Sequence, residues 1–449
     1  MTDALADAVA LPSQPGPAPD LELVLDPAQG LDVSVRRDLA GAPVPEWRVL
    51  AVAAGQPPFT GPDWVRAVHH HLGTGEPLLV SVRRQGRLLA FGAFAVLAGP
   101  RPLVTFLGAG RSDYGAVLAD PGAGVPAGRL VAAVLDAVAE AVPGALFDLE
   151  QVVEHDVLDE VVREWARARG YALRRLPQAT VHAVRLPATV EEHDRALGRH
   201  ARHEERRRWR RLAEQGALTV VDDLLDGLHE LDPVAADARV EHLVAELAAV
   251  DAEHPRAVVR RQPWTGASGR ALAEVLRRTP RGVVQLSGLR LDGELVAYAF
   301  CLAGPRALHG YVQSYRARAA ASGPGALLLL RIRRRALLAG YGELDLLRGE
   351  EAYKRRFERT TRRTVRLLLA PAGRDLLPGL ADRLDLLRRT YRDEFRKHQV
   401  LARRADAVAG RVADVRVDVA RRTALVVAAA DQRLPKRSFP NPFRRRATR

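Results

Sequence analysis

The sequence predicts a mixed α/β fold of two tandem units, each a mostly antiparallel sheet flanked by helices, with a helical C-terminal extension. Two observations predict it. Residues 86–101 (GRLLAFGAFAVLAGPR) recur as residues 293–306 (GELVAYAFCLAGPR), two residues shorter. Because side chains alternate along a strand with a period of 2, an even deletion keeps every side chain on its face. Each copy is followed by a helical pattern and then by an apolar strand that leads to Asp148 or Asp345.

Turn residues divide each repeat into strands. The pair Asp292-Gly293 is a strong hairpin signal because both residues accept a positive φ, and Gln85-Gly86 occupies the matching place in the first copy. The predicted strands are 78–84, 87–97 and 102–108 in the first unit and 283–290, 294–302 and 306–314 in the second. Helices are predicted at 128–142, 189–215, 238–252, 267–278 and 324–339, and a strand near 364–369 is expected to complete the second sheet.

The chain of 449 residues is too long for one ordinary core, since domains average about 150 residues. Composition shifts and the repeat suggest the boundaries. We predict a disordered N-terminus at 1–20, a first unit at 21–187, a second unit at 188–370, a helical extension at 371–432 and a basic tail at 433–449.

The chain is strongly basic, with a formal net charge of +14 and a pI near 10.7. Arginine, alanine and leucine are abundant throughout, so the charge does not define one basic groove. We therefore expect no specific nucleic-acid partner and only weak contact of the basic tail with anionic surfaces. Cys301 is the only cysteine, which excludes an internal disulfide. Because no secretory signal or apolar run of about 18 residues is visible, we expect a cytoplasmic protein without a transmembrane segment.

A group of reactive side chains follows the strand that leads to Asp345. Glu350, Glu351, Tyr353 and Lys354 come directly after Gly349. Carboxylates and lysine at helical spacing also form ordinary surface ion pairs, so a plain surface helix is the alternative. The end of a central strand followed by glycine is, however, where open sheets place reacting groups. We predict these four residues as the catalytic candidates.

The first unit has no equivalent group of reactive side chains, because its matching strand ends in Asp148-Leu-Glu-Gln151 with no tyrosine and lysine after it. We therefore predict that the first unit is non-catalytic.

A glycine-rich string stands before the helix predicted at 324–339. Ser322, Gly323 and Gly325 are common helix-start residues, and this reading alone explains them. Bare backbone N–H groups at a helix N-terminus also hold phosphate oxygens well, which makes the string a candidate pyrophosphate seat. It is neither a P-loop nor a GxGxxG motif. We assign these residues, with Gln313, to cofactor binding.

The candidates for substrate binding are Tyr311 and Tyr315, on the strand that also carries Gln313, and Asp113 and Tyr114. Tyr311, Gln313 and Tyr315 share one face of a strand, since they are two residues apart. Aromatic residues on one face are usually core, but the glutamine between them makes this face partly polar. Asp113 and Tyr114 follow the third strand of the first unit, where they either cap a turn or contact an acceptor at the interface of the units.

No metal centre is predicted. His193, His200 and His203 lie on the polar helix at a spacing that matches no zinc motif, and residues 69–71 (HHH) lack partners in the sequence nearby. Cys301, inside an apolar strand, is best explained as a core residue.

Residues 288–357, with the strings DGELVAYAF, SGPGALLL and DLLRGEEAYKRRF, resemble the CelD/BcsL-type acetyltransferases of the GNAT superfamily, which are related to the Fem peptidyltransferases. The resemblance is strongest over 190–360 and extends weakly to 58–64 and 112–117. It implies two GNAT-like units, acetyl-CoA as donor, and an amine of a sugar or other envelope or exopolysaccharide precursor as acceptor. The usual GNAT pyrophosphate loop, Gln/Arg-x-x-Gly-x-Gly/Ala, is replaced here by residues 322–325.

These observations lead to a prediction of direct N-acyl transfer. An attacking amine must lose a proton, so the site needs a base and donors that face the developing oxyanion. Glu350 or Glu351 is the predicted base, while Lys354 and Tyr353 orient the acceptor or protonate the leaving thiolate. Two alternatives remain open: a Fem-like transferase that takes its acyl group from aminoacyl-tRNA, and a non-catalytic ligand-binding scaffold.

Overall fold

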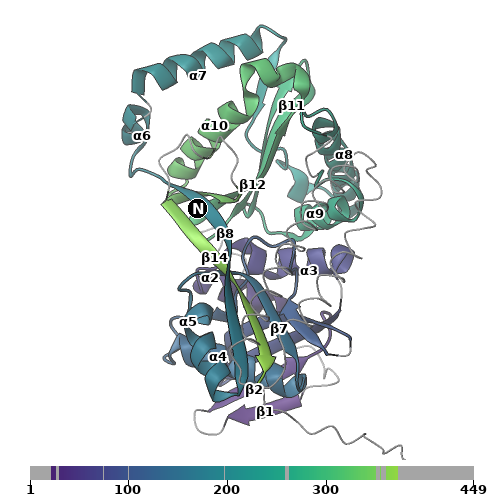
Figure 1. Cartoon of the computed structure of the whole chain (residues 1–449). Coiled ribbons are helices and arrows are strands. Elements are labelled where there is room, and N and C mark those ends of the chain that lie inside the picture. The colour runs from purple at the N-terminus through teal and green to yellow at the C-terminus, as the bar shows by residue number, and fades with distance from the viewer. Residues whose placement is uncertain are drawn as a thin grey trace, which may run out of the picture. The chain divides into compact units, whose positions relative to one another are not determined.

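The computed structural model describes residues 22–26, 30–73, 75–99, 101–196, 198–257, 262–349, 354 and 360–372, and the structural statements below concern these residues. They form a mixed α/β structure in which both halves contribute to one long, mostly antiparallel sheet (Figure 1). The order of its strands is β1-β2-β3-β4-β5-β7-β14-β8-β13-β12-β11-β10-β9, with β6 paired to β4. The predicted fold class is confirmed.

The first half contains the predicted meander, helix and strand. Its strands are β1 (Glu22–Asp26), β2 (Leu31–Arg36), β3 (Glu76–Arg84), β4 (Arg87–Leu97), β5 (Leu103–Phe106), β6 (Leu118–Ala119), β7 (Leu146–Val153) and β8 (Tyr171–Arg185). Its helical segments are α2 (Val44–Ala53), η2 (Pro58–Thr60), α3 (Pro62–Leu72), α4 (Ala127–Ala141) and α5 (Val157–Ala168).

The second half repeats this order. Its strands are β9 (Leu218–Val221), β10 (Val284–Leu291), β11 (Glu294–Ala303), β12 (Ala307–Tyr315), β13 (Glu343–Arg348) and β14 (Thr360–Pro371). Its helical segments are α6 (Val190–Ala196), α7 (Gly198–Ala213), η3 (Leu228–Glu230), α8 (Pro233–Ala252), α9 (Gly266–Arg278), η4 (Ala317–Ser322) and α10 (Pro324–Leu338).

The internal duplication is visible in strand order and in register. The order β2-β3-β4-β5-β7 of the first half matches β9-β10-β11-β12-β13 of the second. In both meanders a two-residue turn joins the first two strands, and both turn residues have positive φ: Gln85 and Gly86 at 50° and 80°, Asp292 and Gly293 at 52° and 82°. This is the geometry of a type I′ hairpin, which matches the right-handed twist of the strands. The two halves therefore arose from one structural plan.

The last strand of each half pairs with the other half's sheet. β8 follows β7 and α5 in the chain but pairs with β13, while β14 follows β13 but pairs with β7. β8 and β14 pair with each other from Tyr171–Pro371 to Ala183–Thr360. The strand expected near 364–369 is thus present, but the expectation that it completes the second sheet is wrong, because it lies between β7 and β8.

Helices cover both faces of the sheet (Figure 1). α4 packs on β2, β3 and β4, and α10 packs on β10, β11 and β12. α8 contacts β11 and β12, and α9 packs against both α8 and α3. One hydrophobic cluster contains Trp47 and Phe59 from the first half together with Trp264 and Phe300 from the second, so the two halves share a core.

Some expectations differ in detail or fall outside the described residues. The helix expected at 189–215 consists of α6 and α7, which start at Val190 and Gly198. The expected N-terminal segment 1–20, the helical extension beyond residue 372 and the basic tail lie outside the described residues. None of the helices in the described part of the chain is both long and apolar enough to span a bilayer.

β14 is tied to the first half by a buried ion pair, and this pair yields a prediction. Arg366 donates to both carboxylate oxygens of Asp148, at 2.7 and 2.5 Å, and the Asp148 residue is 1% exposed. Arg366→Ala leaves that charge buried, so we expect a loss of about 3–5 kcal/mol in the free energy of unfolding. Denaturant unfolding followed by circular dichroism measures it.

The double variant Asp148→Leu with Arg366→Met should recover most of this stability, because it removes both charges. Arg331→Ala is the matched control, since its pair with Asp222 is far more exposed and should contribute about 0–1 kcal/mol. Equal losses for Arg366→Ala and Arg331→Ala would contradict the role assigned to the Asp148 pair.

Candidate functional site

The largest described hollow near the predicted site opens where β12 and β13 separate. These two parallel strands pair only at Ala307–Glu343, Leu308–Leu344 and His309–Asp345. Beyond this point β12 contains a bulge, because Phe300 and Cys301 of β11 face Val312 and Gly310, which leaves Tyr311 as an extra residue. A cavity of about 780 Å³ lies between the separated strands.

The inner wall of this cavity is apolar. It is formed by side chains of β11, α10 and β13: Ala299, Cys301, Leu329, Ile332, Leu344 and Leu346. Such a volume and lining are typical of sites that bury a small organic ligand.

The rim of the cavity is polar and mostly cationic. The first half contributes Arg111 and Asp113, the segment after α8 contributes His254 and Arg256, and the end of β13 is followed by Lys354. Among the described lining residues Asp113 is the acidic one. The site is therefore built from both halves, and its charge favours an anionic ligand.

Asp345, at the end of the β12–β13 pairing, organises a buried polar network. Its residue is 1% exposed. Its carboxylate accepts hydrogen bonds from the Tyr114 hydroxyl at 2.5 Å, from Arg362 at 3.1 Å and from the backbone N–H of Leu347 at 2.7 Å. Burial and the Asp345 carboxylate raise the pKa of the Tyr114 hydroxyl well above its ordinary value, so Tyr114 remains a hydrogen-bond donor.

His309 lies behind the same carboxylate. Its Nδ1–H donates to the Leu302 carbonyl at 3.1 Å, and its Nε2 is 3.9 Å from Asp345 Oδ2. Burial lowers the pKa of His309, so the ring is neutral at pH 7. Asp345 is therefore neutralised chiefly by Arg362, from β14.

The chain turns sharply after β13 and thereby places Lys354. Leu347 has a φ of 60° and Gly349 a φ of 117°. A positive φ is strained for leucine, and such strain concentrates at functional sites. The turn directs the carbonyls of Leu347 and Arg348 toward Lys354, whose ammonium donates to them at 3.3 and 2.8 Å. Lys354 is only 2% exposed yet lines the cavity.

Asp113 forms an ion pair with Arg348 across the two halves. Burial raises the pKa of the Asp113 carboxyl, while Arg348 and Lys354 oppose this rise. A carboxylate with a raised pKa is a better proton acceptor than an ordinary aspartate. Asp113 is thus a candidate proton acceptor at the cavity, in addition to its predicted contact with substrate.

Two segments of the first half form the floor beside Tyr311. Trp64 Nε1–H donates to Ser112 Oγ at 3.1 Å, which joins residues 58–64 to residues 112–117. The rings of Phe59 and Trp64 pack on the Tyr311 ring with centroid distances of 5.6 and 4.9 Å. Burial raises the pKa of the Tyr311 hydroxyl. The aromatic contacts fix Tyr311, the bulged residue of β12, against the first half.

The N-terminus of α10 lies beside the outer end of β12. The Tyr315 ring, which lines the cavity, lies so close to Gly325 that an added Cβ would be 3.5 Å from it. Gly323 has a φ of 60°, and Arg208 of α7 lies against it. Ser322 Oγ accepts a hydrogen bond from Gln215 at 3.0 Å. A helix N-terminus with an arginine beside it favours anions.

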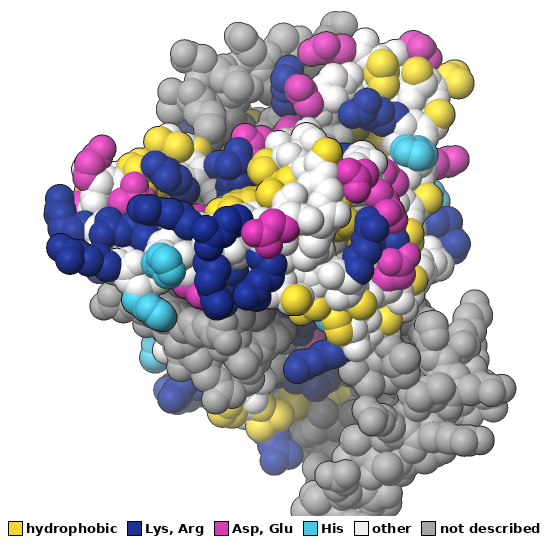
Figure 2. All heavy atoms as spheres, turned by 90° about the horizontal axis from the view of Figure 1, so that it is seen from above, with side chains coloured by type: hydrophobic (Ala, Val, Ile, Leu, Met, Phe, Trp, Pro, Cys, Tyr) yellow, Lys and Arg dark blue, Asp and Glu magenta, His cyan; other side chains and the backbone are white. Residues whose placement is uncertain are grey.

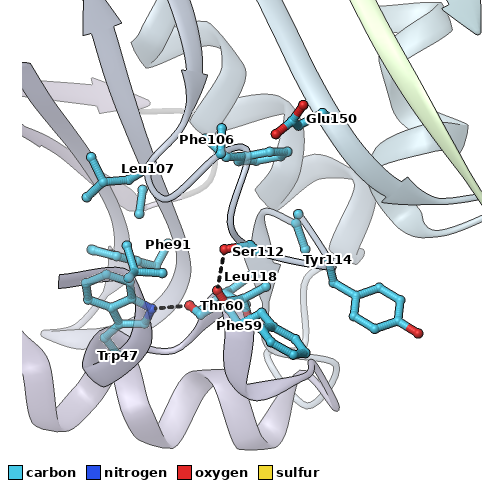
Figure 3. Close-up of a pocket in the computed structure, with 15 residues that line it drawn as sticks. Trp47, Phe59, Thr60, Phe91, Phe106, Leu107, Ser112, Tyr114, Leu118 and Glu150 are labelled. Carbon is cyan, nitrogen blue, oxygen red and sulfur yellow. Dashed lines mark hydrogen bonds between the residues drawn. The ribbon is translucent and has the colours of Figure 1, made fainter. Parts of the chain in front are cut away.

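The matching place in the first half is filled. β5 and β7 also pair in parallel, with Thr105–Asp148 in the position of His309–Asp345. There Phe94 and Val134 occupy the space beside Gly92, where an added Cβ would be 2.4 and 2.6 Å from them. On the opposite face of β4 lies a hollow of only about 20 Å³ (Figure 3). That volume holds little more than one water molecule.

Figure 3 also shows how this small hollow is closed. Trp47 Nε1–H donates to the Thr60 carbonyl at 2.9 Å, and Phe91 and Phe106 fill the space above. The hydroxyl of Tyr114 points away from the hollow, consistent with its bond to Asp345 in the other half. The first half thus supplies side chains to the large cavity of the second half.

The structure brings several predicted site residues together. Those that line the large cavity are Asp113, Tyr311, Gln313, Tyr315 and Lys354. Tyr114 lies behind the cavity, on Asp345, and Ser322, Gly323 and Gly325 lie at the α10 N-terminus rather than on the lining. Glu350, Glu351 and Tyr353 lie outside the described residues.

Sequence reasoning missed the arginines of the site. Arg348 pairs with Asp113 of the first half, and Arg362 of β14 pairs with Asp345 of β13, 17 residues away. Spacing carries no signal for such pairs, although the abundance of arginine around β13 and β14 was visible. It also missed Glu274, which meets the side chains of His70 and His71.

The separated parallel strands, the neighbouring helix N-terminus and the cationic rim together describe an α/β domain with a cavity that suits an anionic ligand. Residues 199–355, from α7 to just beyond β13, match the family model described as acetyltransferase (GNAT) domain. The matched stretch is less than half of the chain, so it identifies a GNAT domain in the second half. A comparison with curated proteins finds no match.

Solved structures with a similar arrangement have low sequence identity. The C-terminal domain (DUF2156) of an Agrobacterium fabrum protein described as a lysylphosphatidylglycerol synthetase is 16% identical, with a TM-score of 0.45 over 76% of this chain and 95% of that one. FemX is 12% identical, with a TM-score of 0.42 over 71% and 94%. A tandem GNAT protein from the clavulanic acid biosynthesis pathway is 15% identical, with a TM-score of 0.39 over 77% and 99%. These scores are too low to transfer an activity.

The cavity wall gives a prediction for Cys301, the single cysteine of the chain. Burial raises the pKa of its thiol to about 12. At pH 8 only about one thiol in 10⁴ is then ionised, and the thiolate is the reactive form. We expect iodoacetamide to label the native protein at least 100-fold more slowly than the urea-unfolded protein, measured by intact mass. Equal labelling rates would contradict the buried wall.

Proposed function

We propose that the protein is an N-acyltransferase that uses acyl-CoA, most simply acetyl-CoA, and that its active site is the cavity between β12 and β13. The observation that carries the proposal is the separation of these strands after three paired residues, which opens about 780 Å³ beside a helix N-terminus. The match of residues 199–355 to an acetyltransferase (GNAT) domain supports the same assignment.

The donor would lie along β12 with its thioester at the inner end. Beyond His309 the backbone of β12 no longer pairs with β13 and faces the cavity instead. The extended, amide-containing arm of the donor could therefore form hydrogen bonds with this backbone. The apolar wall suits the methylene groups of that arm. The pyrophosphate would lie at the α10 N-terminus, near Gly323, Gly325 and Arg208, with Gln313 and Tyr315 between the two ends.

The chemistry would occur between Tyr311 and the end of β13. An amine that attacks the thioester carbonyl must transfer a proton to a base. We propose Glu350 or Glu351 as base, with Asp113 as the candidate that the described geometry adds. The Lys354 ammonium would stabilise the developing oxyanion or protonate the departing thiolate, since it is buried at the cavity. Tyr353 would contribute to the same step.

The acceptor would enter from the side of the first half, past Asp113, with Tyr311 as its platform. We propose an amine of a sugar or of another envelope or exopolysaccharide precursor, in a cytoplasmic reaction. The cationic rim supports an acceptor or donor that carries negative charge, and the resemblance to CelD/BcsL-type enzymes supports the sugar class. The first half, whose matching space is filled by Phe94 and Val134, would be non-catalytic.

A Fem-like transferase that uses aminoacyl-tRNA is the second candidate. It is favoured by α7, whose sequence GRHARHEERRRWRRLA carries many more arginines than glutamates. Figure 2 shows Lys and Arg side chains gathered over this helix, with histidines between them. Tight tRNA binding at physiological salt, with log K falling by about 0.7–0.9 per phosphate contact against log salt, would favour this candidate. We expect only weak binding.

The donor site predicts the effect of charge at Gly325. Gly325→Asp should weaken acetyl-CoA binding at least tenfold, because a carboxylate at the α10 N-terminus repels a pyrophosphate. The fold should survive, since the new Cβ meets Tyr315 at an ordinary 3.5 Å and an acidic residue suits a helix N-terminus. Gly325→Asn, equal in size but neutral, is the control. Isothermal calorimetry that gives equal affinities for the Asp and Asn variants would place the phosphates elsewhere.

Lys354 predicts a kinetic effect on transfer. Lys354→Met keeps the length of the side chain but removes the charge, so kcat/KM for the acceptor should fall at least tenfold, or about 1.4 kcal/mol of transition-state stabilisation. The dissociation constant of the donor should change less than threefold. The assay follows CoA release with a panel of amino sugars and their phosphorylated forms. Donor binding without turnover on any amine would instead favour the ligand-binding scaffold.

A further inference from the structure

Away from the cavity, a helix of the first half packs on a helix of the second half. Three side chains of the kind that bind metal ions meet there. α3 of the first half packs along α9 of the second. His70 and His71, at the end of α3, both approach Glu274 of α9: its Oε2 atom is 3.0 Å from His70 Nδ1 and 2.8 Å from His71 Nε2. The three ligand atoms lie within 4.8 Å of one another.

The two histidines reach the same oxygen by different means. Neighbouring residues on a helix normally point about 100° apart and do not meet. Here His70 uses its near nitrogen and His71 its far nitrogen, and the two rings stack with centroids 4.5 Å apart at 23°. Two imidazole nitrogens therefore converge on one carboxylate oxygen that comes from a helix of the other half.

This donor set is one that borderline divalent cations prefer. Zinc binds imidazole nitrogen and carboxylate oxygen at about 2.0–2.2 Å in tetrahedral geometry, which places neighbouring ligand atoms about 3.3 Å apart. The observed separations of 3.0 and 2.8 Å are within a few tenths of an ångström of that edge. The third separation, between the two histidine nitrogens, is at most 4.8 Å. Because an imidazole binds a metal in its ring plane, the two stacked rings must rotate apart for both nitrogens to face one ion.

The surroundings hold the carboxylate in place and leave one side open. Arg278 pairs with the other oxygen, Glu274 Oε1, at 3.0 Å, which orients Oε2 toward the histidines. The Arg278 side chain is 50% exposed, so water screens its repulsion of a cation. The neighbouring Arg277 is engaged by Asp237 at 2.6 Å and by Glu241.

The cluster also borders a hollow of about 680 Å³, which is lined in part by His71, Glu274, Trp264 and Arg270. The side chain of His70 is 66% exposed, whereas that of Glu274 is 10% exposed. Three protein ligands with a solvent-facing side match zinc sites that keep a fourth position for water or a solute. The ion and the hollow together would then form a ligand site distinct from the cavity of β12 and β13.

We propose that His70, His71 and Glu274 form a binding site for a divalent cation of the Zn²⁺ class, which joins α3 to α9 and carries water as its fourth ligand. The site does not depend on the proposed acyl transfer. It was not visible in the sequence because Glu274 is 203 residues beyond His71.

Calorimetric titration of the full-length, EDTA-treated protein with ZnCl₂ tests the proposal. We expect one saturable site in the wild type, and at least tenfold weaker binding in His71→Ala and in Glu274→Gln. His69→Ala is the matched control, because it removes a neighbouring histidine outside the cluster and should leave the affinity unchanged. The control matters since the chain contains 13 histidines, any of which can bind zinc weakly.

Thermal unfolding gives a second readout, because an ion that binds only the folded chain raises the melting temperature. Zinc should raise it in the wild type and in His69→Ala but not in Glu274→Gln. If Glu274→Gln does not fold, the exposed His70→Ala variant supplies the same comparison. The proposal is overturned if no saturable binding occurs, or if the cluster variants bind zinc as the wild type does, which would leave only hydrogen bonds between the helices.

Discussion

The exchange of final strands between the halves is the constraint on which the rest of the structure depends. β14 leaves the second half to pair with β7, and it carries Arg362 and Arg366 to Asp345 and Asp148, the two buried aspartates at matching positions of the repeat. Each charge would be costly to bury without its partner. The end of β13, and with it the turn that positions Lys354, is therefore held by a strand anchored in the first half.

The two halves share one structural plan but differ where the cavity lies. Both contain a type I′ hairpin, a covering helix and a parallel strand pair, but they differ in the size of the side chains beside that strand pair. Phe94 fills the space in the first half, where Cys301 faces a cavity in the second. The first half instead contributes Asp113, Tyr114 and the Phe59 ring to its neighbour's site. The first half, whose own matching space is filled, thus forms one wall of the cavity in the second half.

Local sequence signals predicted the elements well and the long-range pairings poorly. The repeat, the Asp292-Gly293 turn and Pro324 at the start of α10 mark features that depend on a few adjacent residues. The placement of β14 depends on competition between two similar sheet edges, which no local pattern reveals. Lys354 was identifiable from its strand end. Arg362 was not, because its contact with Asp345 depends on the placement of β14, and Glu274 was not, because its partners come from the distant helix α3.

Hydrogen–deuterium exchange with and without saturating acetyl-CoA tests the central claim, that only the second half opens to hold a donor. The account predicts slower exchange on donor binding for the amides of residues 310–315 and 325–329, which border the cavity and the α10 N-terminus. The matching amides at 106–111 and 128–132 of the first half should not change. Protection of the first-half segments, or no protection of either set under conditions where calorimetry shows binding, would contradict it.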